Sequence, residues 1–168
     1  MEHLKLIILL SYVVIATCIA ILILNLLTLR IKQKSIIDGK IGLSYGIWFV
    51  SLFLSLSVLL YASFEQLQTA IDMLMISPTQ NFWTPILRMS SLHLGFAVLV
   101  FIIWYYVIGL LATVILGNRK DKFEAEGDNY VYFLIKGTLL FCSIWLLVFP
   151  LRTVLTYFLP SVELPLFH

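Results

Sequence analysis

Four stretches of the chain are apolar for long enough to cross a lipid bilayer as a helix. Residues 6–29, 41–64 and 94–116 contain no charged residue, and residues 130–151 contain a single lysine near their start. The hydrocarbon core of a bilayer needs about 20 apolar residues of helix. The pattern therefore predicts four transmembrane spans in a single transmembrane domain that covers residues 1–168.

The basic residues gather in the two loops 30–40 and 117–129, whereas residues 65–93 hold only Arg88. Lysine and arginine are enriched in loops that stay in the cytoplasm. We expect these two loops to be cytoplasmic and both chain termini to lie on the non-cytoplasmic side. The basic residues that support this orientation are Arg30, Lys32, Lys34, Lys40, Arg119, Lys120 and Lys122.

The two halves of the chain share a layout. An arginine opens each basic loop, a glycine closes it, and a second glycine follows early in the next span. We interpret the halves as two tandem helical hairpins in parallel orientation. Chance is the alternative, because any four-span protein with short inner loops has a similar layout. In each loop we expect the incoming helix to continue, with Lys120–Glu124 and Lys122–Glu126 pairs supporting the second extension. We expect Gly39 and Gly127 to end these extensions in the left-handed conformation, and Asp38 and Asp128 to cap the helices that follow.

The segment 65–93 joins the second and third spans and begins with an amphipathic pattern. Leu67, Ile71, Leu74 and Met75 recur at helical spacing, and polar residues occupy the opposite side. Such a helix is typical of one that lies flat at the membrane surface. A lid or a partner-binding element is the alternative.

The composition agrees with an all-α integral membrane protein. Hydrophobic residues make up 61% of the chain and charged residues 12%, with a mean hydropathy of +1.03. Soluble domains carry about twice that charge, so a soluble domain, a disordered chain and a nucleic-acid-binding module are excluded. Cys18 and Cys142 fall in apolar stretches far apart, and we expect both to be buried as small hydrophobic residues.

Ionisable residues inside or beside spans are the candidates for function. Glu65 and Arg152 fall near the outer ends of two spans, and we expect them to pair. Lys136 lies about 9 Å into the fourth span and is expected to reach back to the headgroups. His93 stands at the outer start of the third span without a second histidine or cysteine at matching depth, so neither a metal site nor a bound cofactor is expected.

Three further polar positions are candidates for structure or interaction. Tyr105 falls near the centre of the third span with Trp104 and Tyr106, and we expect at least one of these tyrosines to face the bundle interior. The possible hydrogen-bond partners are Asn25, Ser55, Ser57 and Thr113. Ser51 and Ser55 share one side of the second span and are expected to line either helix contacts or a wet path.

The layout resembles the YjfL-like family of small bacterial inner-membrane proteins of unknown function. The residues that carry the resemblance run from Asp38-Gly39 to Gly46 and from Gly127-Asp128-Asn129 to Gly137. Tyr-Val-Tyr-Phe at 130–133 departs from the small residues expected there. The resemblance implies architecture only and carries over no functional residue. We expect the chain to lie in a bacterial inner membrane.

The chain contains no catalytic motif, and acidic residues are missing from the interior of the predicted spans. We therefore expect a protein that is not an enzyme and that acts as an accessory or scaffold subunit of a larger membrane complex. Its partners would be the lipid bilayer and other membrane subunits or further copies of itself. A self-assembling channel or transporter component is one alternative. A membrane oxidoreductase subunit with a cofactor between chains, using His93, Tyr105 and Lys136, is another.

Overall fold

The computed structural model describes residues 2–37, 40–76 and 83–159. Within these ranges, four helices are long and apolar enough to cross a membrane, which confirms the all-α fold with four transmembrane helices. A two-stranded hairpin and a short helix complete the described elements. In chain order these are α1 (Glu2–Lys34), β1 (Ile36–Ile37), β2 (Lys40–Ile41), α2 (Leu43–Ile76), α3 (Trp83–Leu116), α4 (Asp121–Glu126) and α5 (Tyr130–Thr156).

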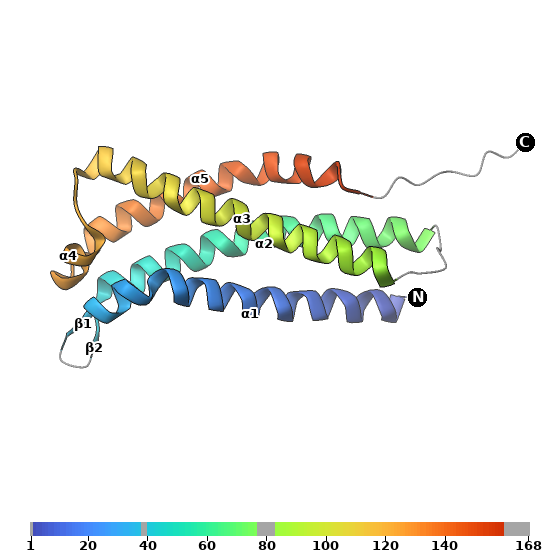
Figure 1. The fold of residues 1–168 in the computed structure, drawn as a ribbon, viewed down its shortest axis with the longest axis horizontal. Coiled ribbons are helices and arrows are strands. Elements are labelled where there is room, and N and C mark those ends of the chain that lie inside the picture. The colour runs from blue at the N-terminus through green and yellow to red at the C-terminus, as the bar shows by residue number, and fades with distance from the viewer. Residues whose placement is uncertain (1, 38–39, 77–82, 160–168) are drawn as a thin grey trace, which may run out of the picture.

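The four long helices form an elongated bundle in which α1 and α3 run opposite to α2 and α5 (Figure 1). The β1–β2 hairpin and α4 lie together at one end, which we call the hairpin end. The start of α1 and the last turns of α2 and α5 lie at the opposite end. The two basic loops therefore share one end of the molecule.

The long helices extend beyond the predicted spans. The prediction that a helix in residues 65–93 lies flat at the membrane surface is wrong. α2 continues without a break through Ile76, so residues 65–76 are its last turns. Their apolar side packs against α1 and α3, with Leu67, Ile71 and Leu74 in one cluster with Ile8 and Ile86. This happens because buried residues recur every three or four positions along all of α2, so the predicted span and the amphipathic segment form one continuous stripe. α5 likewise continues past its internal proline to Thr156.

The loop after α3 also differs from expectation. α1 does extend to Lys34, but α3 ends at Leu116, and Gly117 then adopts a φ of 82° that turns the chain out of the helix. α4 is consequently a separate helix, and the expected lysine–glutamate pairs within it are absent from the described residues. Its glutamates pair elsewhere, Glu124 with Arg119 and Glu126 with Lys34 of α1.

α2 and α5 run parallel and make the most extensive helix contact. Leu52 and Leu56 of α2 and Leu140 and Ile144 of α5 are fully or almost fully buried in one cluster. The two helices approach closely at Gly137, where a Cβ atom would lie 2.2 Å from Ser51 Oγ. A glycine is required at this crossing because any side chain would push the helices apart.

α1 is attached to the bundle along a narrow stripe. Its other side chains are exposed or half-buried, and the buried residues recur every fourth position from Ile8 to Thr28, followed by Ile31; they are Ile8, Tyr12, Ala16, Ala20, Leu24, Thr28 and Ile31. Cys18 faces outward on α1, and Cys142 faces outward on α5. The expectation that both cysteines are buried is therefore wrong, because membrane helices place apolar residues on their lipid-facing sides as well.

Candidate functional site

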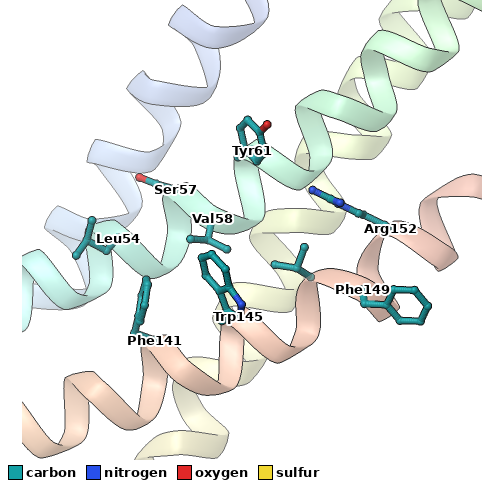
Figure 2. Close-up of a pocket in the computed structure, with 9 residues that line it drawn as sticks. Leu54, Ser57, Val58, Tyr61, Phe141, Trp145, Phe149 and Arg152 are labelled. Carbon is teal, nitrogen blue, oxygen red and sulfur yellow. The ribbon is translucent and has the colours of Figure 1, made fainter.

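A groove runs between the middle of α2 and the middle and later turns of α5 (Figure 2). It encloses about 570 Å³, and we call it the α2–α5 groove. The ring of Trp145 points from α5 into the space between the two helices, and Arg152 reaches across from α5 towards α2. The residues that line the groove include Leu54, Val58, Tyr61, Phe141, Trp145 and Arg152.

Arg152 closes one end of this groove through an ion pair. Its Nη2 atom contacts Oε2 of Glu65 on α2, so the pairing expected from the sequence is confirmed. The side chains of Arg152 and Glu65 are 39% and 35% exposed, which places the pair at the edge of the bundle. Arg152 Nε is buried and forms no hydrogen bond with the described residues. The pair joins the last part of α5 to α2 at a point about three turns before α2 ends.

The chemistry of the α2–α5 groove is that of an apolar binding surface. Its walls are mainly aromatic and aliphatic carbon, and the guanidinium of Arg152 is the charged group among its lining residues. Such a surface accommodates a hydrocarbon chain. Within residues 2–37, 40–76 and 83–159, no group of three or more His, Cys, Asp or Glu side chains is placed to hold a metal ion.

A second polar cluster lies at the hairpin end and is centred on Lys136. The Lys136 Nζ atom lies 2.7 Å from both carboxylate oxygens of Asp121, the first residue of α4. The Tyr132 hydroxyl donates to the same carboxylate at 2.7 Å, and Nζ lies 5.0 Å from the centre of the Trp48 ring. These contacts satisfy a cation that would otherwise be costly at this depth.

The expectation that Lys136 reaches the lipid headgroups is therefore wrong. Its side chain is only 6% exposed and ends on Asp121. The reason is tertiary, because α4 folds back over the start of α5 and brings its carboxylate to the lysine. No helical spacing connects Asp121 with Lys136, so the sequence pattern contained no signal for this pair.

Asp128 fastens the second loop to the start of α2. Its Oδ1 atom accepts a hydrogen bond from the backbone amide of Ser44 at 2.8 Å and thus caps a helix that lies far away in the sequence. A Cβ on Gly42 would lie 2.8 Å from the same oxygen, so this glycine makes room for the carboxylate. The hydrogen bond from Ser44 holds the pKa of Asp128 below its usual value of 3.8. Asp128 lies outside the membrane-spanning helices, where water and protons reach it.

The loop glycine does not end the helix in the expected left-handed conformation. Gly127 has a φ of −82°, and Asp128 adopts the positive φ of 45° instead. Asn129 rather than Asp128 caps α5, by accepting a hydrogen bond from the Tyr132 amide. Because Asn129 caps α5, the side chain of Asp128 is available to cap α2. The corresponding expectation for Asp38 and Gly39 lies outside the described residues.

His93 lies deeper than expected. It sits in the third turn of α3 and is completely buried, rather than at the outer start of a span. Its Nδ1 atom lies 2.8 Å from the Met89 carbonyl oxygen, and its Nε2 atom has no hydrogen-bond partner among the described residues. Within the described part of the chain, no hydrogen bond or ion pair joins His93 to another predicted site residue.

Tyr105, Ser51 and Ser55 lie in the half of the bundle nearer the hairpin end. The Tyr105 ring packs 6.1 Å from that of Trp48, between α3 and α2. Ser51 and Ser55 donate hydrogen bonds to carbonyl oxygens one turn earlier in α2, at 2.9 and 2.7 Å. Ser51 faces Gly137, so this side of α2 forms a helix contact within the chain.

Comparison with known proteins finds no match to this chain among protein-family models, curated proteins or solved structures.

Proposed function

We propose that this protein is a non-catalytic accessory or scaffold subunit of a larger membrane complex, and that it binds a partner helix through the exposed side of α1. The observation that carries this proposal is the position of Asn25. Its side chain is exposed on α1 and forms no hydrogen bond with the described residues. It lies five residues, or about 8 Å, before Arg30 along the helix, within the apolar stretch.

Three outward-facing threonines in the bundle satisfy their hydroxyl groups within their own helices. Thr17, Thr113 and Thr138 donate hydrogen bonds to carbonyl oxygens of their own helices at 2.6 to 2.8 Å. The Asn25 amide, with two donors and an acceptor, has no such arrangement. An unpaired amide in hydrocarbon costs about 2–7 kcal/mol, and asparagine in membrane helices hydrogen-bonds across to neighbouring helices.

The surroundings of Asn25 leave room for such a helix. Leu22 and Leu26 flank it and are 63% and 76% exposed. They form an apolar side that the rest of the chain does not cover, because α1 uses only its narrow stripe for internal packing. In the proposed arrangement the hairpin end faces the cytoplasm, both termini face the other side, and the membrane is a bacterial inner membrane, in keeping with the basic loops.

The experiment is photocrosslinking in intact membranes. Benzoylphenylalanine replaces Leu22, which faces outward beside Asn25. In a separate variant used for comparison it replaces Leu99, which faces outward on α3 with 53% exposure. We expect Leu22 to give a discrete product larger than the 19.3 kDa chain, and mass analysis of that product names the partner. A product containing two copies of this chain would instead favour self-assembly.

Asn25→Leu is the matched variant, because it keeps the helix apolar and removes only the amide. The crosslink from Leu22 should fall strongly in Asn25→Leu and persist in Thr17→Val, whose hydroxyl is already satisfied. Crosslinks to lipid alone at Leu22, or an Asn25→Leu variant that crosslinks as well as the parent, would contradict the proposal.

A further inference from the structure

A cavity of about 600 Å³ opens at the hairpin end between α3, α4 and the start of α5. We call it the basic cavity. Its mouth is formed by Arg119, Lys120 and Lys122, and its inner wall by Tyr106 and Gly109 of α3. It is separate from the α2–α5 groove, and none of its lining residues is shared with that groove.

The mouth of the basic cavity carries unbalanced positive charge. Two of the cations beside it have partners, since Lys136 pairs with Asp121 and Arg119 lies 3.5 Å from Glu124. Lys120 and Lys122 form no ion pair with any residue in the described part of the chain. Two lysine ammonium groups are therefore available to an anion from outside.

The inner wall continues into the apolar part of the bundle. Gly109 lies seven residues before the end of α3, about 10 Å along the helix axis. A Cβ built on Gly109 meets no atom within 4 Å, so the backbone of α3 borders open space here. The cavity thus combines a cationic mouth at the membrane boundary with an uncharged wall that runs into the hydrocarbon region.

We infer that the basic cavity binds the phosphate headgroup of an anionic phospholipid, with the upper part of an acyl chain along Gly109. Basic pockets between membrane helices recognise such headgroups, and lysine is a strong donor to phosphate oxygens. A soluble phosphate compound shares the charge chemistry but has no chain to occupy the wall beside Gly109. The wall therefore favours the lipid as the source of the phosphate.

The test is lipid binding to the purified full-length chain by native mass spectrometry. Phosphatidylglycerol is titrated against phosphatidylcholine with the same acyl chains, and the population with one bound lipid is measured. A lysine at an anionic headgroup contributes about fivefold in affinity, so Lys120→Gln/Lys122→Gln should weaken phosphatidylglycerol binding about 25-fold. The control Arg30→Gln/Lys32→Gln removes the same charge from exposed positions on α1 and should leave binding unchanged.

A second pair of variants tests the inner wall without changing charge. Gly109→Leu fills the cavity, whereas Gly95→Leu places the same side chain in open space elsewhere on α3. Only Gly109→Leu should reduce lipid binding, and both proteins should keep their helix content by circular dichroism. The inference is overturned by equal losses in the Arg30/Lys32 control, by unchanged binding in Gly109→Leu, or by free glycerol phosphate competing as well as the whole lipid.

Discussion

Replacing Gly137 with alanine should force α2 and α5 apart where Gly137 packs against Ser51. The added Cβ would lie 2.6 Å from the Cβ of Ser51 and 2.2 Å from its Oγ. Rotation of the serine side chain relieves only the second of these contacts, because its Cβ is fixed to the backbone of α2. The serine hydroxyl is also held by its hydrogen bond to the Ile47 carbonyl. The helices themselves therefore have to move.

The cost follows from this geometry. Inserting a methyl group into a well-packed contact destabilises a protein by about 1–3 kcal/mol. We expect the upper half of that range, because two parallel helices that share the main cluster have to shift as bodies. Ser51→Gly removes both clashing atoms, so the double variant Gly137→Ala/Ser51→Gly should regain most of the loss. The coupling between the two sites should reach at least about 1 kcal/mol.

The assay is unfolding of the purified protein in mixed micelles by increasing fractions of sodium dodecyl sulfate, followed by tryptophan fluorescence. Trp48 lies beside the contact and reports its loss. Gly46→Ala is the control, since a Cβ there meets nothing within 4 Å, and it should be neutral or slightly stabilising through helix propensity. The reasoning is refuted if Gly137→Ala tolerates the detergent as well as Gly46→Ala, or if Ser51→Gly fails to rescue it.

Three further outcomes are expected in the same assay. Because the pKa of Asp128 is lowered in the folded protein, its carboxylate stabilises the fold fully at pH values above its usual pKa of 3.8. This stabilisation is lost as the pH falls from 3.8 through the lower pKa that Asp128 has in the folded protein. Asp128→Asn should be less stable than the parent near neutral pH, and the difference should shrink over that acidic range; a constant difference would contradict the role of the charge. Lys136→Met should lower the free energy of unfolding by about 3 kcal/mol, because it leaves Asp121 without its cation. The double variant Lys136→Met/Asp121→Asn should recover part of this loss. A double variant less stable than the single one would contradict this and show that the ion pair itself is strongly stabilising. Glu65→Gln should cost less than about 1 kcal/mol, because both side chains of its pair with Arg152 are more than one third exposed, and a larger loss would indicate that the pair is shielded from water.

The sequence by itself determined the class of the fold. Long apolar stretches have no stable alternative to helix in a bilayer, because every backbone amide and carbonyl there needs a partner within its own segment. The same pattern located the two basic loops at one end of the bundle. It also placed Glu65 and Arg152 at corresponding depths, which was enough to predict their pairing.

Tertiary structure decided where the helices end and where their polar groups bind. The amphipathic residues 65–76 gave the same local signal for a surface helix as for an extension of α2, and packing against α1 and α3 selected the extension. The glycine after α3 decided that α4 is separate, and only the resulting fold of α4 brings Asp121 to Lys136.

The capping of α2 by Asp128 and the close approach of Gly137 to Ser51 are decided in the same way. Each contact joins residues that are more than eighty positions apart in the sequence. Helical periodicity carries information only over neighbouring turns, whereas these contacts depend on which sides of α2 and α5 meet. That choice is made by the shape and volume of the buried side chains, which a one-dimensional pattern of polar and apolar residues does not record.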